Sequence, residues 1–301
     1  MNIEMIGLPL DLGANRRGVD MGTSAIRIAG IADALTRIGH NVIDAGDLTV
    51  VVPEVMEIEN PKLKYLPEIT KSVTLLADVV TATLERGNFP LVLGGDHSIA
   101  IGTIGGIARH LHKQKKRLGV IWIDAHGDMN TDKTSLSGNI HGMSFAAVLG
   151  NGCPDLVNVG GNFPKVQPDN AVLVGARNLD PKERQLILES GITVYSMEDI
   201  DRQGIYDVMT DAVNIATKNT DFLHISLDVD ALDPLEAPGV GTPVRGGLTY
   251  REAHTAMEII AGSNKLGSIE VVEVNPILDV RNITAEVAAE LVESALGKRI
   301  I

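Results

Sequence analysis

Short apolar runs alternate with longer segments of helical period along most of the chain. Apolar residues recur every three or four positions at Ile69, Val73, Leu76 and Val80, which is the pattern of an amphipathic helix. The apolar runs that predict β-strands span residues 3–9, 41–45, 90–93, 118–123, 171–174, 222–227 and 268–272. The segments that predict helices span residues 25–39, 69–87, 98–112, 182–190, 205–218, 249–261 and 284–296. Residues 49–67 predict a long loop.

This alternation of strands and helices predicts an α/β fold with a parallel sheet and helices on both faces. The predicted strands are continuous aliphatic runs, as expected when both faces of a sheet are buried. We find no internal repeat or linker, so we expect residues 1–301 to form a single domain. Open parallel sheets bind ligands at the carboxyl ends of their strands. We therefore expect a binding site among the polar residues that follow the strands.

Composition and charge limit the kinds of molecule that the chain is expected to bind. The chain has 26 Lys plus Arg and 39 Asp plus Glu, a formal net charge of −13, and only 3% aromatic residues. An acidic chain with few stacking surfaces predicts no nucleic-acid partner. Cys153 is the only cysteine, so neither an intramolecular disulfide nor a thiolate metal cluster is expected, which fits a cytoplasmic location. The chain has no signal-peptide pattern and no long apolar span, so we expect no membrane association.

Four of the predicted strands end in carboxylate or imidazole side chains. The strand at 90–93 runs into GGDHS, the strand at 118–123 into DAHGD, the strand at 222–227 into DVDALDP, and the strand at 268–272 into EVNP. Because the carboxyl ends of parallel strands meet at one edge of a sheet, these motifs are expected to converge.

The residue types in these motifs are those of a metal site. In an extended backbone, residues two apart point to the same side, so the acidic and histidine residues of DAHGD can share one point, and the aspartates of DVDALDP can share another. Burying such groups without a cation would cost many kcal/mol. The predicted ligands are His97, Asp124, His126, Asp128, Asp228 and Asp230.

A ligand set of nitrogen and oxygen atoms without sulfur suits two metal ions, bridged by carboxylates and roughly 3.5 Å apart. Oxygen-rich ligation favours Mn²⁺, with Zn²⁺, Co²⁺ and Fe²⁺ left open. A water between two such ions is deprotonated near neutral pH, which is hydrolase chemistry.

Each motif alone also has a structural interpretation. His97 can be a core histidine, DAHGD a polar turn, and DVDALDP a cluster of Asx turns. Their occurrence together at the strand ends of one sheet favours the metal site. The sequence contains no GxGxxG, GxxxxGK[ST], GxSxG or HExxH motif.

Six motifs resemble the arginase family in both order and spacing: GGDHS, DAHGDMNT, SGNIHGM, SLDVDALDP, GTPVRGGLTYRE and EVNP. The resemblance extends from GLPLDLGANRRGVDMGTSAIR to the last helix. It implies a three-layer α/β/α sandwich with a mostly parallel eight-stranded sheet. It also implies that hydroxide bridging two Mn²⁺ per subunit hydrolyses L-arginine to L-ornithine and urea.

The resemblance assigns a role to each ligand. His97 and Asp128 complete one manganese site, and His126 and Asp230 complete the other. Asp124 and Asp228 bridge the two ions. The catalytic assignments are His141 as proton shuttle, Glu273 as the carboxylate that pairs with the substrate guanidinium, and Asp128.

The same resemblance assigns the substrate contacts and favours arginine over agmatine, which has no α-carboxylate. Ser137-Gly138-Asn139 can also be read simply as a turn. The α-carboxylate is assigned to Asn130, Ser135, Ser137 and Asn139, the α-amino group to Asp180 with Glu183 nearby, and a further pocket position to Thr242. Arg251 and Glu252 match subunit contacts, which implies a homo-oligomer, either a trimer or a hexamer.

Three alternatives stay open from the sequence. The first is an agmatinase or another guanidino-acid ureohydrolase. The second is a zinc-dependent amide hydrolase on a similar sheet. The third is a metal-stabilised protein without turnover, against which the presence of both His141 and Glu273 argues.

Overall fold

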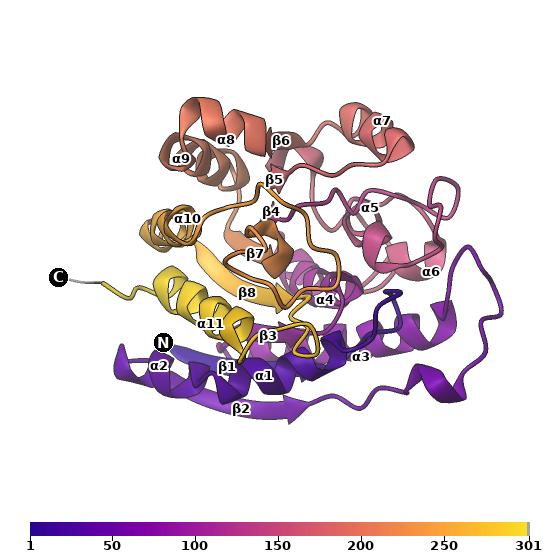
Figure 1. Cartoon of the computed structure of the whole chain (residues 1–301), viewed down its shortest axis with the longest axis horizontal. Coiled ribbons are helices and arrows are strands. Elements are labelled where there is room, and N and C mark those ends of the chain that lie inside the picture. The colour runs from indigo at the N-terminus through magenta and orange to yellow at the C-terminus, as the bar shows by residue number, and fades with distance from the viewer. Residues whose placement is uncertain (300–301) are drawn as a thin grey trace.

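The computed structural model describes residues 1–299, and one eight-stranded sheet runs through it (Figure 1). Every neighbouring pair of strands is parallel, and the spatial order is β2-β1-β3-β8-β7-β4-β5-β6. The strands are β1 Asn2–Leu8, β2 Asn41–Asp47, β3 Phe89–Gly94, β4 Leu118–Ile123, β5 Ala171–Ala176, β6 Thr193–Ser196, β7 Phe222–Asp228 and β8 Leu266–Val272. The eight-stranded parallel sheet implied by the resemblance is confirmed.

Helices cover both faces of this sheet and bury two aliphatic cores. One core holds residues of α1 Gly22–Ile28, α2 Ile31–Arg37, α8 Met197–Gln203, α9 Ile205–Ala216, α10 Tyr250–Gly262 and α11 Ile283–Ala295. The other holds residues of α3 Leu66–Glu85, α4 Ala100–Lys113, α5 Ser144–Val148, α6 Pro154–Val157 and α7 Pro181–Ser190. Strands β3 and β4 are buried on both sides and contain only buried residues, whereas most residues of the edge strand β2 are exposed. This is the predicted three-layer sandwich.

The structure corrects several predicted elements. The helix predicted at 25–39 is two helices, because Gly30 adopts a left-handed φ of 84° between α1 and α2. Strand β6 and helices α5, α6 and α8 were not predicted; each spans seven residues or fewer, too short for a clear period. The loop predicted at 49–67 contains a 3₁₀ turn at Pro53–Val55 and the first two residues of α3.

The four motif-bearing strands lie side by side at the centre of the sheet, in the order β3, β8, β7, β4. Their carboxyl ends are level. Leu93 pairs with Val271, Asp228 with Val272, and Ile123 with Leu227. The register therefore brings the residues after these strands to one edge of the sheet, as predicted.

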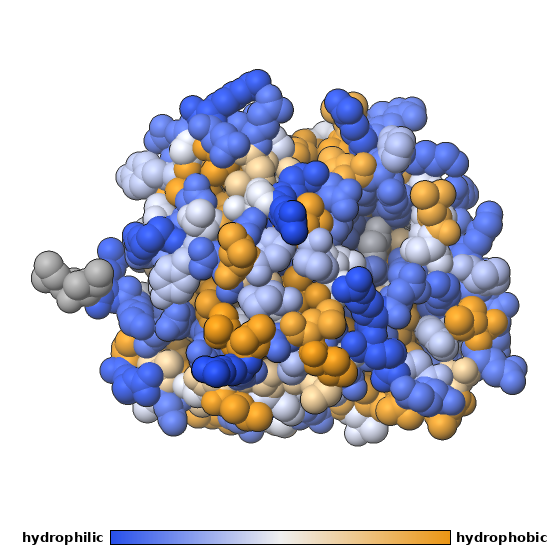
Figure 2. Space-filling model, in the orientation of Figure 1, coloured by the Kyte–Doolittle hydropathy of each residue, from blue (hydrophilic) through white to orange (hydrophobic). Residues whose placement is uncertain are grey.

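The surface in the same orientation is largely hydrophilic, but hydrophobic side chains gather on its lower half, over α1 and the loop before α11 (Figure 2). Large exposed apolar residues in these segments include Ile28, Ile277 and Val280. Within residues 1–299, no helix combines the length and the apolar character that a membrane crossing requires.

Candidate active site

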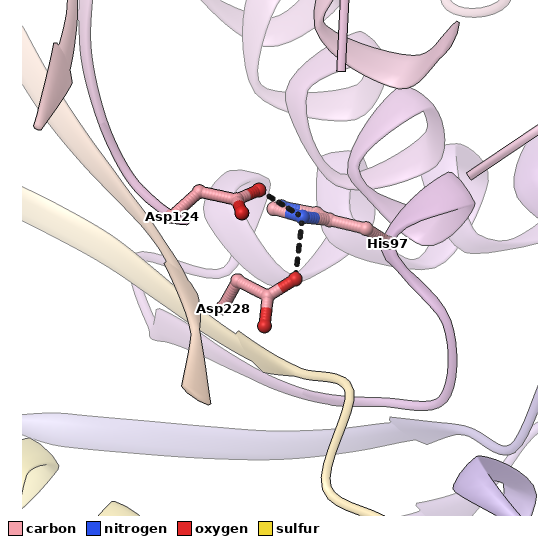
Figure 3. A group of neighbouring side chains, drawn as sticks. All are labelled: His97, Asp124 and Asp228. Atoms are coloured by element: carbon pink, nitrogen blue, oxygen red, sulfur yellow. Dashed lines mark ion pairs between the residues drawn. The ribbon is translucent and has the colours of Figure 1, made fainter. Parts of the chain in front are cut away.

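Two groups of possible metal ligands share one carboxylate. Asp124, directly after β4, directs Oδ2 to Nδ1 of His97 at 3.1 Å and Oδ1 to Nδ1 of His126 at 3.4 Å. His97, Asp124 and Asp228 form one group, and Asp124, His126 and Asp230 form the other. Figure 3 shows the first group, with both carboxylates directed at the His97 ring.

The first group is enclosed and lacks a counter-charge. Nδ1 of His97 lies 3.1 Å from Asp124, 3.1 Å from Asp128 and 3.2 Å from Asp228, and none of these contacts is a hydrogen bond. Burial and the neighbouring carboxylates raise the pKa of Asp228 well above its usual value. A buried nitrogen ringed by three carboxylate oxygens fits a cation, because a cation would satisfy all four groups.

The second group opens toward the protein exterior. Nδ1 of His126 lies 3.1 Å from Oδ2 of Asp230. Thr242 donates its hydroxyl hydrogen to this same oxygen at 2.8 Å. Asp228 belongs only to the first group, and its Oδ1 accepts a hydrogen bond from the backbone of Asp230 at 2.8 Å. The geometry thus shows Asp124, and not Asp228, between the two groups.

Turns, and not extended backbone, bring these ligands together. Asp128 has a left-handed φ of 51°, and Asp230 lies in the 3₁₀ turn Val229–Ala231 that Asp228 caps. The expectation that alternation along a strand directs the ligands to one side is therefore wrong. Strand β4 ends at Ile123 and β7 ends at Asp228, and the side chains converge because the backbone turns at the sheet edge.

A buried hydrogen-bond chain behind His97 determines which nitrogen faces the carboxylates. Ser226 donates to Oε1 of Glu270 at 2.7 Å, so its oxygen is left to accept from Nε2 of His97, also at 2.7 Å. The hydrogen of the His97 ring is then on Nε2, and Nδ1 presents a lone pair to the site. This is the tautomer that a metal ligand needs. His224 contacts the same Glu270 oxygen at 3.3 Å.

Glu273 and His141 form a second polar pair beside these groups. Nδ1 of His141 lies 3.0 Å from Oε1 of Glu273, which also accepts from the backbone of His97 at 2.9 Å. Burial alone would lower the pKa of His141, but the hydrogen bond and charge of Glu273 raise it to about 9. Oε2 of Glu273 is buried without a hydrogen-bond partner, so it can accept from a ligand.

Two adjoining cavities, of about 160 and 410 Å³, lie above these groups. All the predicted substrate contacts line the smaller one: Asn130, Ser135, Ser137, Asn139, Asp180, Glu183 and Thr242. Ser135 and Ser137 also accept backbone hydrogen bonds from Gly138 and Asn139, at 3.0 and 3.2 Å. The segment is thus both a turn and a cavity wall. A larger surface hollow of about 760 Å³ lies beside Leu111 and Phe163, away from these residues.

Backbone N–H groups hold the Glu183 carboxylate on the acidic side of the smaller cavity. Glu183 accepts hydrogen bonds from Met129 at 3.0 Å and from Asp180 at 3.2 Å, within the capping box that begins α7. Burial raises the pKa of Glu183 to about 7. Asn130 donates to Asp180 at 3.3 Å. Glu183 therefore supports the loop after β4, while Asp180 is tied to a neighbouring cavity residue.

The structure adds cavity residues that the sequence analysis missed. Asn178 lines both cavities, and Asn15 and Arg16 line the larger one. Asn178 follows β5 by two residues, so the strand-end argument used for the other motifs was a signal that could have found it. Asn15 and Arg16 lie far from any strand end. Arg251 and Glu252, predicted at subunit contacts, lie on α10 outside both cavities, where Glu252 completes a capping box with Thr249.

Comparison with known proteins identifies the family of the chain. The model of the Arginase family matches residues 1–297. An arginase of Brevibacillus brevis is 52% identical over 301 residues, covering 100% of this chain and 99% of that protein. The crystal structure of an arginase from Bacillus cereus is 51% identical with a TM-score of 0.94, and the match covers 100% of both chains. A hypothetical agmatinase from Burkholderia thailandensis is 26% identical with a TM-score of 0.73, covering 98% of this chain and 84% of that one. The chain is therefore an enzyme of the arginase family.

Proposed function

We propose that this enzyme hydrolyses L-arginine to L-ornithine and urea, with two Mn²⁺ as its cofactors. The observation that carries the proposal is the shared carboxylate of Asp124, which joins two histidine–aspartate groups under a cavity that ends on the free oxygen of Glu273. The arginase names of the similar proteins support arginine as the substrate.

The two groups supply enough nitrogen and oxygen ligands for two divalent ions. One ion would be held by His97, Asp124, Asp128 and Asp228, and the other by Asp124, His126 and Asp230. When bound, the ions would lower the pKa of a water at the site and so supply the nucleophile for hydrolysis.

The residues of the chain orient the substrate and move its protons. The buried Oε2 of Glu273 would accept a charge-assisted hydrogen bond from the guanidinium and hold its carbon toward the ligand groups. His141, whose ring reaches both cavities, would donate the proton that the departing ornithine amine needs.

The smaller cavity would hold the α-amino acid end of arginine. We assign the α-carboxylate to Asn130, Ser135, Ser137 and Asn139, and the α-amino group to Asp180. Because Glu183 is engaged by two backbone donors, its contribution is to place Asp180 and Asn130. Thr242 acts on Asp230 through its hydrogen bond.

An agmatinase or guanidino-acid ureohydrolase is the main alternative, and one assay separates them. The protein is preloaded with Mn²⁺, and urea release is measured from arginine, agmatine and 4-guanidinobutyrate. We expect kcat/KM for arginine to exceed the other two by at least about 100-fold, because hydrogen bonds to a charged carboxylate are strong. Equal or greater turnover of agmatine would refute the assignment.

We further infer that residues 1–301 act as one domain in a homo-oligomer, a trimer or hexamer, with Arg251 and Glu252 at subunit contacts, and that the enzyme works in the cytoplasm. The exposed side chains of Ile28, Ile277 and Val280 give such an assembly an apolar surface to bury. Light scattering of the purified enzyme tests the assembly.

A further inference from the structure

The segment before α3 packs directly on the turn that carries Ser137 and Asn139. Gly138 has a φ of 73°, and a Cβ there would lie 1.9 Å from the carbonyl oxygen of Pro61. The backbone N–H of Lys64 donates to the carbonyl of Gly138 at 3.1 Å. In Figure 1 this violet segment rises at the right-hand edge of the molecule before it enters α3. A part of the chain remote in sequence thus supports the wall of the smaller cavity.

The Lys64 side chain reaches the cavity residues themselves. Its Nζ donates to Oδ1 of Asn139 and to Oδ1 of Asn15, each at 3.0 Å. Asn139 lines both cavities and Asn15 lines the larger one. One ammonium group therefore joins three segments of the chain, and both acceptors are neutral amides that leave its positive charge uncompensated.

These contacts determine the orientation of the side-chain amides of Asn139 and Asn15. An ammonium group only donates, so it holds the oxygen of each asparagine and leaves the amide nitrogen on the other side of the planar group. Asn139 lines the smaller cavity, and its NH₂ group is not a buried atom without a partner, so it is available to donate to a ligand there. The rim of the cavity thus presents amide donors backed by a cation, whereas Asp128, Asp180 and Glu183 line the same cavity.

We propose that Lys64 is a positioning residue that makes the enzyme selective for substrates with a carboxylate at the end remote from the guanidinium. It orients Asn139 as a donor to that carboxylate and supplies positive charge behind it. This inference rests on the proposed function and deepens it. Arginine carries the carboxylate, whereas agmatine does not, so the contribution of Lys64 is confined to arginine.

The test compares Lys64→Met with Lys62→Met, which removes the same charge from an exposed neighbour two residues away. Both variants and the parent are loaded with Mn²⁺, and kcat and KM are measured for arginine and agmatine. We expect Lys64→Met to raise KM for arginine about 5- to 10-fold, as for loss of a hydrogen bond to a charged group, with less than a twofold change in kcat. We expect KM for agmatine in Lys64→Met, and both kcat and KM of Lys62→Met, to stay at parent values. Lys64→Arg is expected to return KM for arginine most of the way to the parent value.

Other outcomes overturn the proposal. An unchanged KM for arginine in Lys64→Met removes Lys64 from selectivity. An equal rise for arginine and agmatine shows a structural role only, as does the same effect in Lys62→Met. If the parent releases no urea from arginine, the proposed function fails separately. Calorimetric binding of L-ornithine and putrescine then decides: equal loss of affinity for both, or no loss, in Lys64→Met overturns the carboxylate role.

Discussion

The His141 ring lies 3.0 Å from the carboxylate of Glu273, although the two residues are 132 positions apart in the chain. Both side chains are largely buried, so their mutual attraction is weakly screened by solvent. The pair links the turn His141–Met143, which follows the loop after β4, to the end of β8. Its charge state therefore bears on the stability of the fold as well as on the proposed proton transfer.

The pair predicts a pH-dependent stability in the metal-free protein. The pKa of His141 is about 9 in the folded state and about 6.5 when unfolded, so its stabilisation is complete below about pH 6.5 and is lost as pH rises through 9. We expect His141→Asn to remove a fall of up to about 3 kcal/mol in unfolding free energy between pH 6.5 and 9. Urea titrations in the presence of a chelator measure it. The exposed His112→Asn is the control, and an unaltered slope in His141→Asn would contradict the prediction.

The shared carboxylate predicts unequal metal loss from two substitutions. Asp124 contributes one oxygen to each group, whereas His126 contributes to one. We expect His126→Asn to retain about one Mn²⁺ per subunit and Asp124→Asn to retain close to none after dialysis, since His126→Asn removes a ligand from one group and Asp124→Asn removes a ligand from both. Elemental analysis gives the count, with Asp155→Asn as an exposed control. Full loading of Asp124→Asn would show that the site lies elsewhere.

The chain behind His97 predicts that a serine without access to the cavity affects metal affinity. Ser226→Ala removes the acceptor that keeps the hydrogen on Nε2 of His97. We expect affinity for Mn²⁺ to fall about 10- to 100-fold, the usual effect of losing an outer partner of a histidine ligand. Competition with a chelator measures the affinity. Ser268→Ala is a matched control because Ser268 contacts His224 and not His97, and equal losses in both variants would refute the tautomer argument.

The loop after β4 predicts a loss of affinity for arginine that does not extend to agmatine. Asn130→Ala and Ser137→Ala each remove a polar group from the smaller cavity. We expect KM for arginine to rise at least about 10-fold, because a bond to a charged carboxylate is lost, while KM for agmatine changes less than twofold. Steady-state urea release measures both. A parallel rise for the two substrates would remove these residues from the α-carboxylate contact.

Much of this fold follows from local sequence, and the exceptions have physical causes. The strand at Leu118–Ile123 was predicted with its observed ends because a buried parallel strand is a continuous aliphatic run. The break at Gly30 was not predicted, since the apolar period continues across it. The strand Thr193–Ser196 is short and partly exposed at the sheet edge, so its pattern is weak.

The candidate site was likewise predicted from the sequence only in part. The candidate ligands were predicted because they follow strands, but their convergence was ascribed to extended backbone, and the left-handed φ of Asp128 was not predicted. The approach of Lys64 to Asn139 was also invisible, because a contact across 75 positions depends on how two loops pack. Sequence thus supplied the candidate ligands, whereas the contacts between loops around the cavity depend on tertiary packing.

The place of β8 in the sheet imposes an order on biosynthesis. This strand is the last to emerge from a ribosome, yet it lies between β3 and β7 and pairs with both. Until Val272 is available, the nascent chain can build β2-β1-β3 and β7-β4-β5-β6 only as separate half-sheets, each with an open edge prone to mispairing. His97 and Asp124 then remain on different halves, so the candidate metal-ligand group that contains both can assemble only after β8 has been synthesised.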